Sequence, residues 1–170
     1  MACGSRESQA DHFLRAVLAL AQVQPTNPAV PTAALYDESA DAARVIRAAV
    51  RLAARGHRNI VLVFGANWCG DCRALDREMR QPDLASLIER NYVVVKIDVG
   101  RRDKNLELGD AYHVPVKDKG IPALAVLDPN GKLLHAQAEG EFADAGRMEH
   151  AAFQAFFEQW KPKGPDPRRD

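Results

Sequence analysis

Hydrophobic positions repeat along the chain in two periods, and the changes between them divide it into predicted helices and strands. Residues 42–55 carry an apolar stripe at helical spacing, with Ser39 as the predicted N-cap and Gly56 as the predicted stop. The short unbroken apolar run at 60–64 is typical of a strand that is buried on both faces, and the apolar-rich segment 92–99 predicts a second buried strand. The first half of the chain therefore combines an amphipathic helix with two buried strands.

The second half continues the alternation of helix and strand. Pro129-Asn130-Gly131 is a hairpin turn signal, in which Gly131 tolerates a positive φ. The other predicted elements are a helix over 73–80 that Pro82 kinks or restarts, a weak helix over 105–112, strands over 123–127 and 132–135, and a closing helix over 148–160. The order helix, strand, helix, strand, helix, strand, strand, helix predicts an α/β fold with a central mixed β-sheet flanked by helices on both faces.

Proline-rich segments at the two ends set the expected domain boundaries. Three prolines fall within 22–31, a composition that favours an extended linker over a helix. We therefore expect an N-terminal leader or extension with its linker over 1–35, one domain over 36–160, and a charged, proline-rich tail over 161–170. A total of 170 residues fits one domain with extensions better than two domains.

Composition and charge exclude several classes of partner. Lys plus Arg and Asp plus Glu each number 23, so the formal net charge is zero and no global field attracts nucleic acid or an anionic membrane. No apolar run approaches the roughly 18 residues that span a bilayer, so we expect no integral membrane segment. We expect partners to be selected by local shape and chemistry instead.

The N-terminal segment permits more than one interpretation. Residues 16–21 read Ala-Val-Leu-Ala-Leu-Ala and end in a small-x-small pattern like that of a cleaved signal. Glu7, Asp11 and Arg15 interrupt such a signal, so an amphipathic helix or a disordered leader remains the alternative. Cys3 is either a lipoprotein acylation site or a stray free cysteine.

Two of the three cysteines form a Cys-x-x-Cys pair between a predicted strand and a predicted helix. The segment reads Trp68-Cys69-Gly70-Asp71-Cys72. At a helix N-terminus, free backbone N–H groups and the macrodipole stabilise a thiolate, so Cys69 is the predicted nucleophile. Cys72, one turn further, is the predicted resolving thiol. A zinc half-site is the alternative, but a structural zinc site needs four ligands and no second Cys-x-x-Cys is present, so we expect no metal.

Two motifs about 50 residues apart together resemble the thioredoxin superfamily. The segment from Ala66 to Arg73 is similar to the active-site segment of that family. Gly120-Ile121-Pro122-Ala123-Leu124, followed by an apolar strand and the hairpin turn, is similar to its cis-proline loop. The resemblance covers 36–160 and is greatest to single-domain bacterial thioredoxin-like or disulfide-isomerase-like proteins, so it implies a thioredoxin-like fold.

The resemblance also assigns supporting roles at the site. It implies that Pro122 is cis and packs against the disulfide, which leaves the backbone of Ile121 to pair with a substrate strand. Trp68 would border the substrate groove, and Gly70 and Asp71 lie between the cysteines. The alternatives are an ordinary loop proline at 122 and a purely packed indole at 68.

Two positions depart from the family pattern. Asp71 stands where thioredoxins usually carry proline, and a carboxylate beside the sulfurs opposes thiolate formation. It should make Cys69 less acidic and the pair more reducing, unless it is simply a solvent-facing residue at the helix start. Val63 stands where thioredoxins usually have a buried aspartate that relays a proton to the resolving thiol, so water or a side chain such as Glu78 would have to move that proton.

Other polar residues give weaker signals. Arg73 matches a frequent basic position of the family and either screens Asp71 or, as the favoured interpretation, is a plain surface residue. His113 is either a catalytic histidine or a plain loop histidine, and the plain loop histidine is the favoured interpretation. Asp98 is expected to cap or solvate a sheet edge, and the charged segment 100–104 to form a solvated turn.

The sequence therefore predicts a protein-disulfide reductase or isomerase that needs no cofactor beyond its own redox-active disulfide. Its expected partners are proteins with thiols or disulfides and a redox partner protein, and we expect a monomer. The alternative is a binding module, or a Cu(I)-handling chaperone that uses the same two soft thiolates. A zinc-stabilised structural protein is the third class. Exported proteins of the resembled group often work in the bacterial periplasm, which favours the cell envelope slightly over the cytoplasm.

Overall fold

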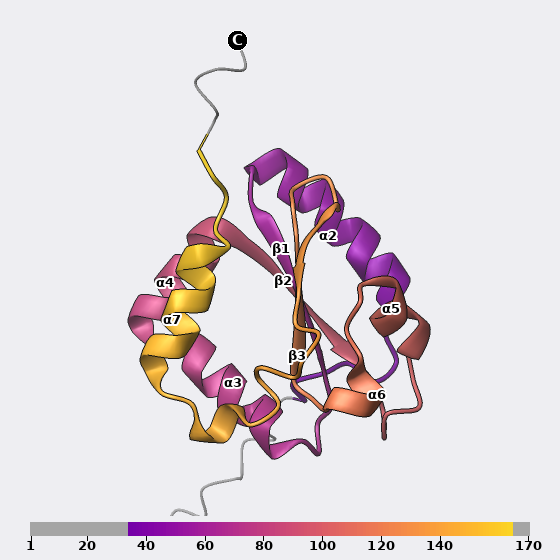
Figure 1. The fold of residues 1–170 in the computed structure, drawn as a ribbon. Helices are drawn as coiled ribbons and strands as arrows, with labels where there is room; N and C mark the ends of the chain where they lie inside the picture. The colour runs from indigo at the N-terminus through magenta and orange to yellow at the C-terminus, as the bar shows by residue number, and fades with distance from the viewer. Residues whose placement is uncertain (1–33, 165–170) are drawn as a thin grey trace, which may run out of the picture. The chain divides into compact units, whose positions relative to one another are not determined.

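The structure is a computed structural model that describes residues 34–164 (Figure 1). The predictions about the linker at 22–31, the leader and Cys3 lie outside the described residues, as does the end of the tail. The described residues belong to one compact unit. None of the described helices is long and apolar enough to cross a membrane.

Helices and strands alternate as the hydrophobic pattern predicts, with two additions. In chain order the elements are α2 (Ala42–Gly56), β1 (Asn59–Gly65), α3 (Gly70–Met79), α4 (Pro82–Asn91), β2 (Tyr92–Asp98), α5 (Leu106–Ala111), α6 (Val116–Lys119), β3 (Ala123–Leu127), β4 (Leu133–Ala136), the 3-10 helix η1 (Ala145–Arg147) and α7 (His150–Gln159). The short elements α6 and η1 were not predicted, because three or four residues carry no readable period.

The four strands form one mixed sheet in the order β2-β1-β3-β4. β1 pairs parallel with β2, whereas β1 with β3 and β3 with β4 are antiparallel. The parallel pair needs a long crossover, which α3 and α4 supply. In its register Val63 lies opposite Lys96, and Gly65 lies opposite Asp98. The predicted mixed sheet is thus confirmed.

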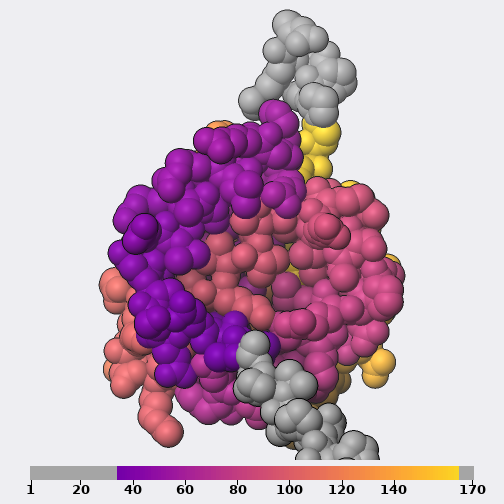
Figure 2. Space-filling view, turned by 180° about the vertical axis from the view of Figure 1, so that it is seen from behind, coloured from indigo at the N-terminus to yellow at the C-terminus, as the bar shows by residue number. Residues whose placement is uncertain are grey.

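Each face of the sheet carries its own layer of apolar side chains. α2 packs on one face, and α3, α4 and α7 pack on the other (Figure 1). Seen from behind in Figure 2, α2 in purple lies on one side of the molecule and α4 in rose on the other. All seven residues of β1 are buried, as expected for a central strand covered on both faces.

Some predicted helix ends are wrong by a few residues. Asp41, not Ser39, caps α2, because its carboxylate accepts the backbone N–H of Arg44 at 2.9 Å. The left-handed residue that ends this helix is His57, with a φ of 50°, and not Gly56. α3 begins at Gly70 instead of residue 73, and α4 is a separate helix with Pro82 in its first turn.

Candidate active site

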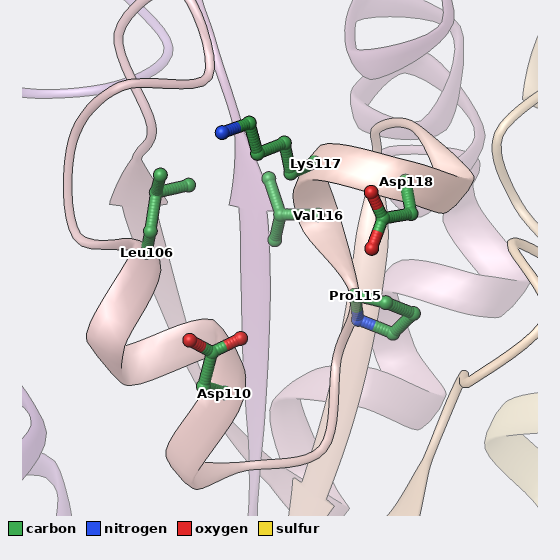
Figure 3. Close-up of a pocket in the computed structure, with 6 residues that line it drawn as sticks. All are labelled: Leu106, Asp110, Pro115, Val116, Lys117 and Asp118. Atoms are coloured by element: carbon green, nitrogen blue, oxygen red, sulfur yellow. The ribbon is translucent and has the colours of Figure 1, made fainter.

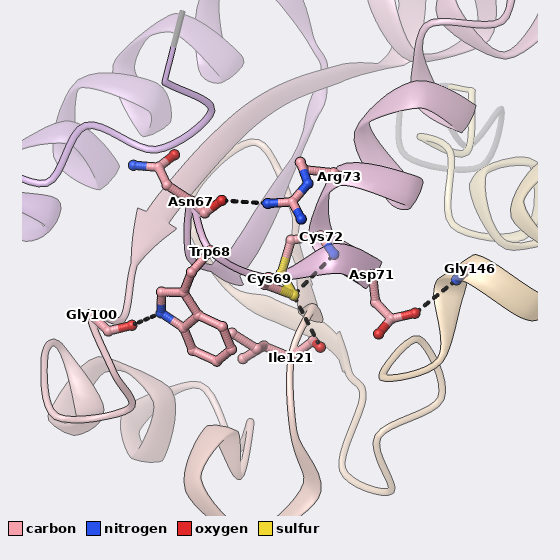
Figure 4. Close-up of a disulfide and its surroundings, with 9 residues drawn as sticks. All are labelled: Asn67, Trp68, Cys69, Asp71, Cys72, Arg73, Gly100, Ile121 and Gly146. Atoms are coloured by element: carbon pink, nitrogen blue, oxygen red, sulfur yellow. Dashed lines mark hydrogen bonds between the residues drawn. A yellow bond between two sulfur atoms is a disulfide. The ribbon is translucent and has the colours of Figure 1, made fainter. Parts of the chain in front are cut away.

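Cys69 is the last residue before α3 and is itself the N-cap of that helix. Its sulfur accepts the backbone N–H of Cys72 at 3.0 Å (Figure 4). The two Cα atoms lie 5.2 Å apart, and the sulfurs form a disulfide. Both residues are buried, Cys69 with 4% of its surface exposed and Cys72 with 1%. The structure thus places the predicted pair at the start of α3 at disulfide distance.

Backbone groups at the N-terminus of α3 surround the sulfur of Cys69. The N–H of Cys72 points at the sulfur of Cys69, and the positive end of the α3 macrodipole lies there as well. Both interactions favour a thiolate over a thiol at this position. Cys72 lies inside the first turn, where burial opposes a charge.

The loop before β3 brings a second segment against the first sulfur. The peptide bond between Ile121 and Pro122 is cis, as the resemblance implied. The carbonyl oxygen of Ile121 lies 3.6 Å from the sulfur of Cys69 (Figure 4). Both loop residues are buried. The structure therefore brings together the two motifs that are about 50 residues apart in the sequence.

Trp68 and Gly70 flank the nucleophile in different ways. The indole of Trp68 is 49% exposed, and its Nε1 donates to the carbonyl oxygen of Gly100 at 2.7 Å. This hydrogen bond fixes the ring while leaving much of it open to solvent, so Trp68 is not a purely packed indole. A Cβ on Gly70 would meet nothing within 4 Å, so the space outside this residue is open.

Asp71 and Arg73 each bind a backbone group and do not pair with one another. The Oδ1 atom of Asp71 accepts the N–H of Gly146 at 2.9 Å, which joins α3 to η1 (Figure 4). Arg73 donates to the carbonyl oxygen of Asn67 at 2.8 Å and so closes the active-site loop. Arg73 is thus an exposed surface residue, as favoured, and does not screen Asp71. Asp71 is not simply solvent-facing, because it accepts the N–H of Gly146.

Val63 stands on β1 where thioredoxins usually have a buried aspartate, and Lys96 of β2 lies opposite it. Val63 is 1% exposed, and its partner across the sheet is Lys96. Asp76 of α3 accepts hydrogen bonds from Lys96 and from Arg80. Burial acts to raise the pKa of the Asp76 carboxyl, but these two hydrogen bonds outweigh it and hold that pKa below its usual value. The carboxylate that pairs with Lys96 therefore comes from Asp76 of α3 and not from β1.

Glu78 does not serve the sulfurs directly. One of its carboxylate oxygens lies 2.9 Å from Nδ1 of His150, at the start of α7. The side chain is thus engaged between α3 and α7, so the suggestion that Glu78 moves the proton of Cys72 gains no support from its contacts.

Tyr36 is a site residue that sequence reasoning missed. Its backbone N–H donates to Oδ1 of Asn67 at 2.9 Å, and Nδ2 of Asn67 donates to the carbonyl oxygen of Tyr36 at 2.9 Å. The ring is 1% exposed. The signal that could have found it is Gly65, because a glycine in a buried strand marks the close approach of another group.

The weaker polar predictions have mixed outcomes. His113 is an exposed loop residue with a φ of 57°, as favoured. Asp98 neither caps nor solvates a sheet edge; it is 5% exposed and lies 3.1 Å from Nζ of Lys104. That lysine belongs to the predicted solvated turn, so part of the turn is tied to the sheet.

A hollow lies between α5 and α6, away from the sulfurs (Figure 3). Its lining residues are Leu106, Asp110, Pro115, Val116, Lys117 and Asp118. None of the predicted site residues lines it. Among residues 34–164, no group of three or more His, Cys, Asp and Glu side chains is placed to hold a metal ion.

Known proteins resemble this chain in sequence. A family model described as thioredoxin-like matches residues 41–129, more than half of the chain. Thioredoxin-1 of Drosophila yakuba is 39% identical over 83 residues, which are 49% of this chain and 69% of that protein. A probable nucleoredoxin 3 of Oryza sativa subsp. japonica is 28% identical over 109 residues, or 54% of this chain and 23% of that much longer protein.

Solved structures agree with the sequence relatives. The crystal structure of a disulphide isomerase from Xylella fastidiosa Temecula1 is 44% identical, with a TM-score of 0.70 over 74% of this chain and 95% of that one. A thioredoxin from Thermus thermophilus, at 21% identity and a TM-score of 0.50, shares the fold over 66% of this chain and 81% of its own. The chain belongs to the thioredoxin-like family.

Proposed function

We propose that the protein is a thiol–disulfide oxidoreductase that exchanges disulfides with other proteins through Cys69 and Cys72. One observation carries the proposal: the sulfur of Cys69 accepts the N–H of Cys72 at the start of α3 and faces the Ile121 carbonyl oxygen at 3.6 Å. A pair with only a structural role has no need of an activated sulfur beside a second backbone segment. The reaction needs no cofactor beyond the disulfide itself.

The exchange proceeds in two displacements. The Cys69 thiolate attacks one sulfur of a substrate disulfide, and the other substrate sulfur leaves as a thiolate that takes up a proton. Cys72 then loses its proton, its sulfur attacks Cys69, and the second substrate sulfur departs as a thiol. Two electrons have moved from the protein dithiol to the substrate disulfide. The reverse sequence oxidises a substrate dithiol.

The backbone around Ile121 supplies a place for the substrate chain. Its carbonyl oxygen already lies beside the Cys69 sulfur, so a strand that pairs with this loop presents its own disulfide there. The exposed face of Trp68, held through Gly100, forms the other border. We propose extended, disulfide-containing or thiol-containing protein segments as substrates.

The direction of electron flow follows from the reduction potential of the pair. A carboxylate at Asp71 disfavours the Cys69 thiolate and so favours the disulfide over the dithiol, which makes the protein more reducing. We therefore propose a reductase or isomerase. The Xylella protein, which is called a disulphide isomerase, is compatible with that direction.

Reduction of insulin by dithiothreitol tests the proposal. We expect the wild type to accelerate it, and Cys69→Ser to return the rate to that of dithiothreitol alone. Cys3→Ser is the matched control, since it removes a cysteine outside the pair and should leave the rate unchanged. No acceleration by the wild type, together with stoichiometric Cu(I) binding that both Cys69 and Cys72 require, would contradict the proposal and favour the copper-handling alternative.

A further inference from the structure

The segment that carries Tyr36 is joined to the active-site loop although it precedes the residues matched by the family model. Asn67 binds both backbone polar groups of Tyr36, and its Nδ2 also donates to Glu38 at 2.9 Å. Lys104, from the loop after β2, donates to the backbone carbonyl of Glu38. These contacts hold the segment in one place beside the site.

The phenol of Tyr36 fills the space that a side chain at position 65 would occupy. A Cβ built on Gly65 would lie 2.2 Å from the Tyr36 hydroxyl and 2.9 Å from the sulfur of Cys72. The hydroxyl oxygen and the sulfur are therefore no farther apart than the sum of these two distances. The missing side chain at Gly65 leaves room for the hydroxyl beside the resolving sulfur.

Charged groups around the ring keep the phenol neutral. Asp76 faces it from α3 and Asp98 from β2; each carboxylate is paired, with Lys96 and Lys104 respectively. Nζ of Lys96 lies 5.9 Å from the centre of the ring. Burial first, and then the two carboxylates, raise the pKa of Tyr36 far above its usual value. The hydroxyl therefore keeps its proton and remains a donor throughout the working pH range.

We propose that the Tyr36 hydroxyl donates a hydrogen bond to the sulfur of Cys72 when that sulfur becomes a thiolate, and thereby stabilises it for attack on the mixed disulfide. This inference rests on the proposed exchange reaction. A buried thiolate needs such a donor, because burial opposes its charge. Val63 provides none, and the ammonium of Lys96 is neutralised by Asp76.

The proton balance of the resolving step stays simple. The proton of Cys72 passes to solvent, the Cys72 sulfur bonds to Cys69, and the bond between Cys69 and the substrate sulfur breaks. The departing substrate thiolate takes up one proton. Tyr36 keeps its own proton and contributes only the hydrogen bond. Its effect is thus confined to the second displacement.

A two-phase reaction separates the displacements. Reduced protein is mixed with an aromatic disulfide whose leaving thiolate absorbs visible light, in a Cys3→Ser background so that only the pair reacts. Attack by Cys69 releases the first coloured thiolate, and attack by Cys72 releases the second. The variant Tyr36→Phe is compared with Tyr92→Phe, which removes another buried hydroxyl, one that donates to the carbonyl oxygen of Phe157 at 2.6 Å.

We expect Tyr36→Phe to slow the second phase about threefold to tenfold near neutral pH and to move its pH midpoint upward by about one unit, a tenfold change in the thiolate equilibrium. The first phase should stay within about twofold, because Cys69 keeps its own donor from the backbone. Tyr92→Phe should change neither phase. If Tyr36→Phe does not fold, Asn67→Ala, which frees the Tyr36 backbone, should slow the second phase more than the first.

The outcomes separate this inference from the proposed function. An unchanged second phase and pH midpoint in Tyr36→Phe would overturn the role of Tyr36. Equal slowing of both phases would also overturn it, because that result describes a structural residue. A wild type that shows no second phase and does not reduce insulin would instead overturn the exchange reaction itself.

Discussion

At the scale of single residues, the two sulfurs have different surroundings although only two residues separate them. Cys69 lies immediately before α3 as its N-cap and accepts a backbone N–H, whereas Cys72 lies within the helix, close to the Tyr36 hydroxyl. The backbone N–H of Cys72 donates to the sulfur of Cys69, and we propose that the Tyr36 hydroxyl donates to the sulfur of Cys72. These different surroundings are the basis of the nucleophilic and resolving roles that we propose for Cys69 and Cys72.

Asp71 provides a test at the residue scale. Asp71→Asn removes a negative charge near the sulfurs but keeps the oxygen that accepts the N–H of Gly146. We expect the pKa of Cys69 to fall by about one unit, because a like charge no longer opposes the thiolate. Thiolate absorbance followed during a pH titration measures this value. An unchanged or higher pKa of Cys69 would show that Asp71 acts only as an anchor for η1.

The residues that the sequence reveals are those whose chemistry is local. Cys69 and Cys72 follow from spacing at a helix start, and Pro122 follows from its resemblance to a family loop. Tyr36 contacts Asn67 across 31 positions, and no period or motif in the sequence marks that contact. The same holds for Asp98, whose partner Lys104 is set by the path of a loop.

At the scale of elements, ion pairs and hydrogen bonds tie helix ends together. His150 at the start of α7 lies 2.9 Å from both Glu78 of α3 and Asp83 of α4. These hydrogen bonds, that of Glu78 first, raise the pKa of His150 above its usual value, and the bond to His150 lowers the pKa of Asp83. The charged imidazole of His150 thus connects α7 with α3 and α4 on one face of the sheet.

The hydrogen bonds of His150 predict a pH dependence of stability. Because the pKa of His150 is higher in the folded than in the unfolded chain, its stabilising contribution is complete below the unfolded value near 6.5 and is lost as the pH rises through the folded value. We expect the melting temperature of the wild type to exceed that of His150→Gln at pH 6 and the two to converge at alkaline pH. A constant difference between the two melting curves at all pH values would contradict this account.

Element positions follow well from the hydrophobic pattern, and element ends do not. The predicted strand 60–64 became Asn59–Gly65 with the same buried residues. α3 starts earlier than its apolar pattern because the Cys69 sulfur serves as its cap, a role that composition alone does not indicate. α2 likewise takes its cap from Asp41 through a contact of one carboxylate.

At the scale of the whole molecule, two apolar layers hold the sheet that positions the site. α7 closes one layer: Phe157 is fully buried, and its ring meets that of Tyr92 edge to face at 5.4 Å. The mixed sheet and its two covered faces could be predicted from the alternation of elements, because buried strands need cover on both sides. The docking of residues 35–38 could not, since it depends on side chains of the site.

The core predicts a graded loss of stability along α7. Phe157→Ala should lower the free energy of unfolding by about 3–5 kcal/mol, because it leaves a cavity between α7 and the sheet. Phe156→Ala, at a half-buried position on the same helix, should cost clearly less. Urea unfolding measures both values. Equal losses would contradict the assignment of Phe157 to the centre of this layer.

The central claim is that Cys69 attacks and Cys72 resolves, and trapping of the mixed disulfide tests it most directly. Cys72→Ser and Cys69→Ser, both with Cys3→Ser, are reduced and mixed with oxidised insulin, and the products are identified by mass spectrometry. We predict that Cys72→Ser accumulates a covalent adduct through Cys69 that dithiothreitol releases, and that Cys69→Ser does not. An adduct that forms only through Cys72, or in neither variant, would contradict the account.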